Sequence, residues 1–176
     1  CSRRCAARSG TRRCAEAEAA AVLPARYSAG FAQCRRCRLR RRNAGAAAVS
    51  GDVIFFFDDD AWLTDPSFIS RALAAFRDWP QLGILQPRVH DPLSDSDATR
   101  WIPRIRKGNP QESSAAFSVW EGALLVRRST FDAAGGFGDE LFYYHEGIEL
   151  AWRCWDGDHV AWYAGNLEAH HPAASP

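Results

Sequence analysis

Residues 54–63, IFFFDDDAWL, lead a run of large apolar side chains directly into three consecutive carboxylates. The β-branched and aromatic residues at 53–57 predict a buried strand. Adjacent carboxylates repel one another and resist desolvation, so they require a cation, bound protons or contact with bulk water. A hard divalent metal held by Asp58, Asp59 and Asp60 is the simplest partner, and a solvated acidic turn is the alternative.

The order of the elements around this triplet predicts the fold class. A strand at 53–57, a helix that starts near Asp65 and Pro66, and a strand at 82–89 indicate an α/β layer with parallel strands. Asp65 suits the N-cap position and Pro66 the first helical position. The other expected elements are a helix at 43–51, a long loop at 90–113, strands within 117–128, helices at 129–135 and 145–158, and a strand at 159–164.

The amino-terminal stretch differs in character from the rest of the chain. Residues 1–42 carry twelve of the 22 basic residues and two of the 21 acidic ones, and residues 1–41 hold five of the six cysteines. Without sustained periodicity, 1–41 is expected to be disordered and to precede one α/β domain at 42–176. Two origins stay open. The stretch is either a basic segment that binds zinc through Cys34 and Cys37 or nucleic acid through its arginines, or a product of out-of-frame translation.

Two long motifs resemble a known family. RNAGAAAVSGDVIFFFDDDAWLTDPSFI and WEGALLVRRSTFDAAGGFGDELFYYHEGIELAWRCWDGDHVAWYAGNLEAHHP follow the order found in bacterial family 2 glycosyltransferases, including rhamnosyltransferases. The resemblance covers about residues 42–172 and implies a GT-A fold, which is an α/β fold with a mixed sheet and flanking helices. Nothing in residues 1–41 resembles the family's amino-terminal nucleotide-binding unit. We therefore expect that unit to be missing, which would leave the nucleotide pocket incomplete.

The resemblance assigns the acidic triplet to the donor substrate. In the family, this motif holds a divalent metal and, through the metal, the diphosphate of a nucleotide sugar. Asp58 would lie nearest the ribose, Asp60 would be the direct metal ligand, and Asp59 would complete the donor-binding motif. Oxygen ligands with spare coordination positions suit Mg²⁺ or Mn²⁺. Such a metal neutralises the charge that develops on the departing nucleoside diphosphate.

The resemblance places the catalytic base in the motif FYYHEGIELAWR at 142–153. Relatives often have Glu-Asp where this chain has Glu146 and Gly147, and their acidic pair deprotonates the acceptor hydroxyl. Glu146 is the first candidate for the base and Glu149 the second, because residues three apart share a helix face. An apolar setting beside Tyr143, Tyr144 and Trp152 would raise the pKa of such a carboxyl. The alternative for Glu146 is a helix-start carboxylate that interacts with the helix dipole.

Further side chains complete the expected site. His170 or His171 would add an imidazole to the metal ligands, by resemblance to a histidine that relatives carry near this point, and an exposed histidine pair is the alternative. Trp120 and Trp101 are the candidates for an acceptor-binding face, because indole rings stack on sugars. Arg153 is expected to brace Glu149 at i, i+4, with contact to donor phosphates as the alternative.

The resemblance implies an inverting, metal-dependent hexosyltransferase that serves polysaccharide or cell-wall synthesis. It would move a sugar from a nucleotide-diphosphate donor to a hydroxyl of a glycan or lipid-linked saccharide. Cys154, as the sole cysteine of 42–176, fits the cytoplasm. Arg100, Arg104, Arg106 and Lys107 form a basic loop that faces solvent, an anionic acceptor or the inner face of the plasma membrane. A nucleic-acid-binding protein that uses the basic tail is the rival from another class.

Overall fold

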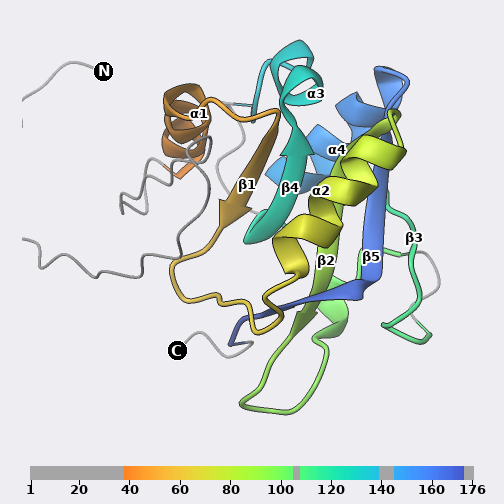
Figure 1. Ribbon diagram of the computed structural model, residues 1–176. Helices are drawn as coiled ribbons and strands as arrows, with labels where there is room; N and C mark the ends of the chain where they lie inside the picture. The colour runs from red at the N-terminus through yellow and green to blue at the C-terminus, as the bar shows by residue number, and fades with distance from the viewer. Residues whose placement is uncertain (1–37, 105–107, 139–144, 173–176) are drawn as a thin grey trace, which may run out of the picture.

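The computed structural model describes residues 38–104, 108–138 and 145–172, and for residues 38–41 it describes the backbone alone (Figure 1). The elements are α1 (Arg38–Ala48), β1 (Val53–Phe57), α2 (Phe68–Asp78), β2 (Leu82–His90), a 3₁₀ turn η1 (Thr99–Trp101), β3 (Ser114–Ala115), β4 (Ala123–Arg127), α3 (Arg128–Ala133), α4 (Glu146–Asp156) and β5 (Val160–His170). No helix within these described ranges is long and apolar enough to cross a membrane.

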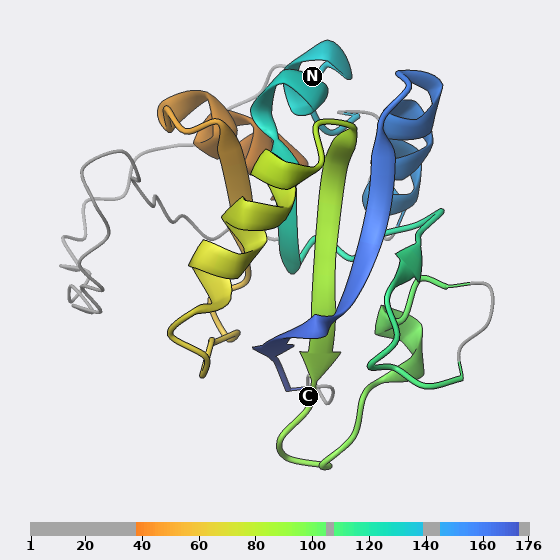
Figure 2. The same ribbon diagram turned by 45° about the vertical axis from the view of Figure 1, so that its right-hand side comes forward.

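The strands form one mixed five-stranded sheet in the order β1-β4-β2-β5-β3. β1 and β2 run in the same direction, as the strand–helix–strand order predicted, but they are not neighbours. β4 lies between them and pairs antiparallel with both, whereas β2 and β5 are parallel. Figures 1 and 2 show α2 on one face of this sheet and α4 on the other. The predicted α/β class with a mixed sheet and flanking helices is confirmed, and the expectation of adjacent parallel strands is wrong for β1 and β2.

Alternation along β1 shows how the apolar run fills both layers. Ile54 and Phe56 point into the cluster formed with α1, α3 and α4, and the Phe56 ring lies 5.4 Å from that of Phe131. Phe55 points to the opposite face, where its ring stacks on Phe68 of α2 at 5.8 Å. Each large apolar side chain that is fully removed from water stabilises the fold by roughly 1.5–3 kcal/mol. The strand is therefore held firmly up to the point where the carboxylates begin.

Helix α2 starts two residues later than predicted. Asp65 accepts hydrogen bonds from the backbone N–H and the hydroxyl of Ser67, so it organises the turn that precedes the helix, and regular helix begins at Phe68. These hydrogen bonds lower the pKa of the Asp65 carboxyl. Phe68, Ala72 and Phe76 recur at helical spacing and are buried against the sheet.

Other expected elements hold with shifted bounds. The predicted helix at 43–51 is α1, which begins earlier, at Arg38, and thereby crosses the domain boundary expected at residue 42. Most of the tail predicted to be disordered or out of frame, residues 1–37, lies outside the described ranges. The strand predicted at 159–164 is β5, which continues to His170.

Two apolar residues of α4 differ in their burial. Cys154 is 1% exposed, and burial raises the pKa of its thiol to about 12. Trp152 was expected to help form an apolar setting beside the candidate base, but it is 60% exposed, so that expectation is wrong for Trp152. Tyr143 and Tyr144, named for the same setting, lie outside the described residues. The apolar stripe of α4 instead runs through Leu150, Ala151 and Cys154, and Trp155 lies at its border with its indole N–H donating to the Ala116 carbonyl.

Candidate metal and acid site

Three side chains at the carboxyl end of β1 and β5 converge. One ligand atom from each of Asp58, Asp60 and His171 lies within 4.8 Å of the other two. Nε2 of His171 is 3.0 Å from an Asp60 oxygen and 4.0 Å from an Asp58 oxygen. His171 is buried and Asp60 is exposed, so the group lies at the protein surface with one wall packed. Two carboxylates and an imidazole in this arrangement fit a divalent metal.

The backbone fixes this arrangement at two points. The Asp58 amide donates to the Gly122 carbonyl at 2.8 Å, which anchors the end of β1 to the start of β4. Trp62 and His170 then form an isolated antiparallel bridge with backbone hydrogen bonds of 3.0 and 2.9 Å. Because this bridge joins the segment after the triplet to the end of β5, it brings Asp60 next to His171.

The His171 ring is oriented by its second nitrogen. Nδ1 lies 2.7 Å from the backbone carbonyl oxygen of Pro172, and a carbonyl oxygen only accepts hydrogen bonds. Nδ1 therefore carries a proton, which leaves Nε2 as the nitrogen that would bind a metal. Fixing the tautomer of a ligating histidine through such a partner is the usual arrangement in metal sites.

His170 points to a different set of partners. Its Nε2 lies 3.0 Å from a Glu168 oxygen and 3.1 Å from the Thr64 hydroxyl, and its ring stacks on Trp62 at 5.6 Å. Burial, the neighbouring His90 and the charge of Arg88 lower the pKa of His170. Of the two histidines that the sequence offered as metal ligands, the structure brings His171 to the carboxylates and keeps His170 away from them. Asp59 is exposed and does not belong to the converging group.

Arg42 links Asp58 to two further carboxylates. Its Nη2 donates to Asp58 at 3.1 Å, while Nη1 lies 3.5 Å from Glu121 and 3.7 Å from Glu146. Asn43, the next residue, exchanges two 2.9 Å hydrogen bonds with the backbone of Phe137, which holds this part of α1 in place. The side chains of Arg42, Glu121 and Glu146 are 11%, 14% and 1% exposed. Sequence reasoning named neither Arg42 nor Glu121 as a site residue.

Glu121 has a strongly perturbed carboxyl group. Burial raises its pKa to about 7, the charge of Arg42 opposes the rise, and the charge of the adjacent Glu146 adds to it. A signal for this residue exists in the sequence, because a lone carboxylate stands two residues before the apolar strand Ala123–Arg127. The antiparallel pairing of β4 with β1 is what turns that position toward the site.

The second candidate for the base, Glu149, is engaged elsewhere. It forms an ion pair with Arg153 at i, i+4, as the sequence predicted. Arg153 also donates to the backbone carbonyls of Ala134 and Gly136, so it ties α4 to the turn after α3. This structural brace is confirmed, and among the described residues Glu149 has its ion pair with Arg153 rather than with Arg42.

The predicted tryptophans lie beside the metal candidate. Trp101 and Trp120 stack at 4.9 Å, and both rings meet the His171 ring edge-on, at 5.2 and 4.9 Å. Trp101 is 4% exposed, which leaves little of its ring for a sugar, while Trp120 is half-buried. Gln86, fully buried in β2, donates to the Trp101 carbonyl and accepts from the Trp120 amide, each at 2.6 Å. A lone glutamine inside an apolar strand is the feature of the sequence that could have predicted this contact, because a buried amide side chain needs hydrogen-bond partners.

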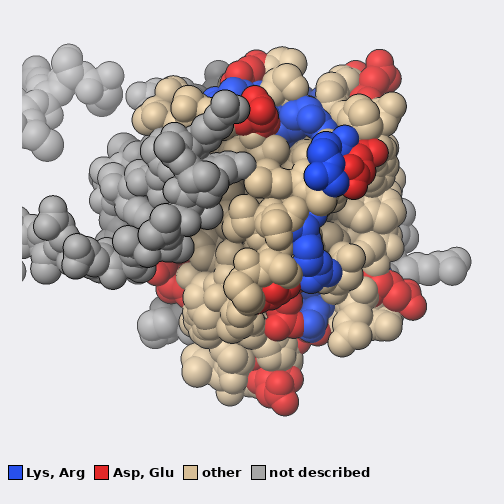
Figure 3. All heavy atoms as spheres, in the orientation of Figure 1, with Lys and Arg blue, Asp and Glu red and all other residues tan. Residues whose placement is uncertain are grey.

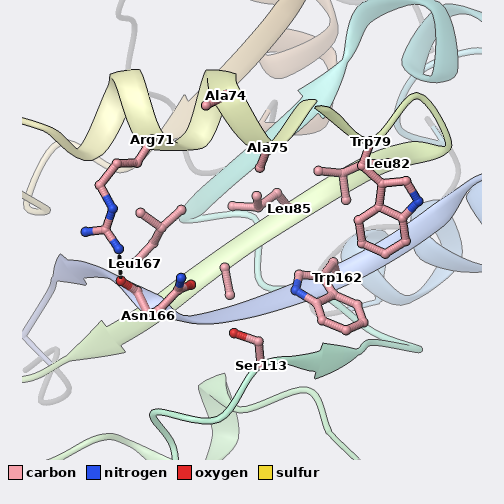
Figure 4. A pocket seen from close by; sticks show the side chains of 11 residues that line it. Arg71, Ala74, Ala75, Trp79, Leu82, Leu85, Ser113, Trp162, Asn166 and Leu167 are labelled. Carbon is pink, nitrogen blue, oxygen red and sulfur yellow. Dashed lines mark hydrogen bonds between the residues drawn. The ribbon is translucent and has the colours of Figure 1, made fainter. Parts of the chain in front are cut away.

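A separate hollow of about 520 Å³ lies between α2 and β5 (Figure 4). Trp79 and Trp162 stand at one end, and Arg71, which donates to the Asn166 carbonyl at 2.8 Å, stands at the other. None of the converging acidic or histidine residues lines it. Basic and acidic side chains are interspersed on the face shown in Figure 3.

The hypothesis of nucleic-acid binding depends on the basic tail, and residues 1–37 of that tail lie outside the described ranges.

Solved structures resemble this fold. GalNAc-T7 with UDP, GalNAc and Mn²⁺ aligns with a TM-score of 0.58 at 15% identity, over 76% of this chain and 30% of that one. The mannosyltransferase PcManGT from Pyrobaculum calidifontis, in complex with GDP-Man and Mn²⁺, aligns with a TM-score of 0.58 at 13% identity, over 78% and 36%. At these identities the likeness shows the fold alone, which is the GT-A fold.

Sequence comparisons reach further. The N-acetylglucosaminyl-diphospho-decaprenol L-rhamnosyltransferase of Mycobacterium tuberculosis, from two strains, is 29% identical over 158 residues, which cover 76% of this chain. The chain spans about half the length (51%) of these curated relatives. A family model described as Glycosyl transferase family 2 matches residues 35–134, more than half of the chain and including Asp58, Asp60 and Glu121. The chain therefore belongs to glycosyl transferase family 2.

Proposed function

We propose that this chain is part of an inverting glycosyltransferase that moves a sugar from a nucleotide-diphosphate donor to a hydroxyl of a glycan or lipid-linked saccharide. The observation that carries the proposal is the convergence of Asp58, Asp60 and His171 within 4.8 Å at the end of a buried strand. Family membership makes a sugar donor the natural ligand of such a group. Asp59, the exposed member of the triplet, would complete the donor-binding motif.

The ligand set suits Mn²⁺ better than Mg²⁺. Mg²⁺ prefers an all-oxygen octahedral shell, whereas Mn²⁺ tolerates an imidazole beside carboxylates. Asp58, Asp60 and His171 would hold the ion, and a bound divalent ion would neutralise charge on the departing nucleoside diphosphate. Both aligned solved structures carry Mn²⁺, which agrees with this choice.

The chain's own residues would divide the remaining tasks. Arg42 holds Asp58 and the carboxyls of Glu121 and Glu146 within reach of one guanidinium, so it keeps three acidic groups together in one site. A carboxylate of this group would take the proton of the acceptor hydroxyl, and its two candidates are Glu146, which the family resemblance favours, and Glu121. Trp120, half-buried beside His171, would border the acceptor.

The acceptor class follows from the relatives. The curated relatives are named for a diphospho-decaprenol acceptor and for transfer of L-rhamnose. By analogy we propose a lipid-linked saccharide acceptor, a rhamnose-type donor, and work at the cytoplasmic face of the plasma membrane in cell-wall or polysaccharide synthesis. Such an acceptor would require peripheral contact with the membrane.

Calorimetry tests the donor site directly. The full chain is titrated with UDP, GDP and dTDP in the presence and absence of Mn²⁺. We expect at least one nucleoside diphosphate to bind only with Mn²⁺ and to raise the melting temperature through its binding energy. Asp60→Ala should weaken this binding at least about tenfold, since it removes a ligand of the proposed ion.

Asp156→Ala is the matched control. Asp156 is an exposed carboxylate at the end of α4, so its removal changes the net charge equally without touching the site. Equal loss of nucleotide binding in both variants would mean that net charge, and not the converging ligands, governs binding. Absence of any Mn²⁺-dependent binding by the wild-type chain would refute the proposed function.

A further inference from the structure

The segment 120–122 borders the candidate metal group on two sides. The Gly122 carbonyl receives the amide hydrogen bond of Asp58 at 2.8 Å, and the ring of Trp120 packs edge-on against His171 at 4.9 Å. The residue between them is Glu121. Buried Gln86 fixes this segment by accepting the Trp120 amide hydrogen bond. Glu121 therefore has a defined position next to the residues proposed to hold donor and metal.

Glu121 and Glu146 form a buried acidic pair. Oε2 of Glu146 is buried and receives no hydrogen bond from the residues that the structure describes, and its side chain is 1% exposed. The adjacent Glu121 carboxyl can supply the missing donor when it is protonated, and burial raises the pKa of Glu121 to about 7. Arg42 compensates the remaining charge from α1. Glu121 can therefore exchange a proton near neutral pH.

Gly147 makes room for this pair. A Cβ atom on Gly147 would lie 1.9 Å from the Val119 carbonyl oxygen and 3.1 Å from Oε2 of Glu121. The backbone before β4 and the Glu121 carboxyl thus occupy the space beside Glu146 that a side chain at position 147 would need. The acidic pair is assembled from two segments that are distant in sequence.

The two carboxyl groups differ in access. The Glu146 side chain is 1% exposed and the Glu121 side chain 14% exposed, so an acceptor hydroxyl can approach Glu121 more readily. A general base must come within hydrogen-bond reach of the proton that it removes. A pKa of about 7 for Glu121 also lies where a general base works best at neutral pH.

We propose that Glu121 is the catalytic base of the proposed sugar transfer and that Glu146 is a positioning residue that acts through it. The inference rests on the proposed function. As the acceptor oxygen bonds to the anomeric carbon, its proton passes to the Glu121 carboxylate. The bond between that carbon and the diphosphate oxygen breaks, and its electron pair stays on the leaving nucleoside diphosphate.

Kinetics of three isosteric variants test the assignment. Turnover is measured with nucleotide-activated L-rhamnose and polyprenyl-diphosphate-linked N-acetylglucosamine as probes, and Mn²⁺-dependent binding of the nucleoside diphosphate is measured in parallel. For Glu121→Gln we expect kcat to fall at least about 100-fold, with nucleotide affinity within about threefold of wild type. The acid limb of the kcat–pH profile near pH 7 should disappear from the residual rate.

Glu146→Gln should act differently. It removes a like charge beside Glu121, so the acid limb should move to lower pH while at least a tenth of kcat remains. Glu112→Gln, at an exposed glutamate before β3, is the control and should match wild type. If Glu121→Gln keeps more than a third of kcat with its pH limb, or if Glu146→Gln alone abolishes turnover, the assignment is overturned.

The binding measurement separates the two proposals. If the wild-type chain binds the nucleotide with Mn²⁺ but Glu121→Gln remains active, only the assignment of Glu121 as the base is refuted. Loss of all Mn²⁺-dependent nucleotide binding in the wild-type chain removes the sugar transfer itself, and the inference about Glu121 falls with it.

Discussion

Nε2 of His171 lies 3.0 Å from Oδ1 of Asp60, although the two residues stand near opposite ends of the described chain. If both are ligands, loss of the imidazole should weaken metal binding. We expect His171→Ala to lower Mn²⁺ affinity about 10- to 100-fold. Titration of Mn²⁺ into the protein, followed by calorimetry or by the electron paramagnetic resonance signal of the free ion, measures this change.

The neighbouring histidine gives the comparison for that measurement. His170 contacts Glu168 and Thr64 on its own side of β5, so His170→Ala should change Mn²⁺ affinity by less than about threefold. A larger effect at His170 than at His171 would show that the ligand set has been assigned to the wrong ring.

Glu121 should make stability depend on pH. Its folded-state pKa is raised from 4.5 to about 7, so the folded protein binds more protons than the unfolded chain between these values. This stabilisation is complete below about pH 4.5 and is lost as the pH rises through about 7. Relative to Glu121→Gln, wild type should therefore lose on the order of 3 kcal/mol of unfolding free energy between pH 4.5 and 8. Urea denaturation of both proteins across this range measures the difference.

The sign of the slope is decisive in that experiment. Burial drives the shift of Glu121, while the charges that face it, Arg42 from α1 and Glu146 from α4, act in opposite directions. If wild type gained stability over the variant as the pH rose, Arg42 would outweigh burial, and the carboxyl would be charged throughout.

Arg153 should contribute to stability by joining two elements. Its guanidinium donates to the carbonyls of Ala134 and Gly136 and pairs with Glu149, so Arg153→Ala leaves partly buried acceptors without donors. We expect a loss of about 1–3 kcal/mol in unfolding free energy. Arg77→Ala, which removes only an exposed pair with Asp78, should cost much less than Arg153→Ala, because water screens that pair. Equal losses in denaturation experiments would contradict the role of the carbonyl contacts.

A methyl group at Gly147 should be destabilising. Its Cβ would lie 1.9 Å from the Val119 carbonyl oxygen, so α4 or the segment before β4 would have to shift. We expect Gly147→Ala to lower the unfolding free energy by about 1–3 kcal/mol, despite the higher helix propensity of alanine. Gly45→Ala in α1, where a Cβ meets nothing within 4 Å, should be neutral or stabilise by up to about 1 kcal/mol. In thermal melts, the melting temperature of Gly147→Ala should therefore fall, while that of Gly45→Ala should stay the same or rise.

Several elements could be predicted because their signals are local. The strand Val53–Phe57 appears at the expected residues, since five β-branched or aromatic residues in succession favour extended backbone. The ion pair of Glu149 with Arg153 follows from helical spacing alone. Trp152 was misplaced because α4 carries apolar residues around more of its surface than the sheet covers, and periodicity does not say which of them lose contact with water.

The sequence by itself determined that an apolar strand ends in carboxylates, that helices and strands alternate around it, and which family the motifs resemble. Only the tertiary structure decided which residues share the site. Successive side chains of a strand point to opposite faces, so a slip of one residue at the Trp62–His170 bridge would exchange His170 for His171. Likewise, Glu121 and Glu146 meet because β4 runs antiparallel beside β1 and α4 packs closely at Gly147. These contacts join segments far apart in the chain, and no local pattern encodes them.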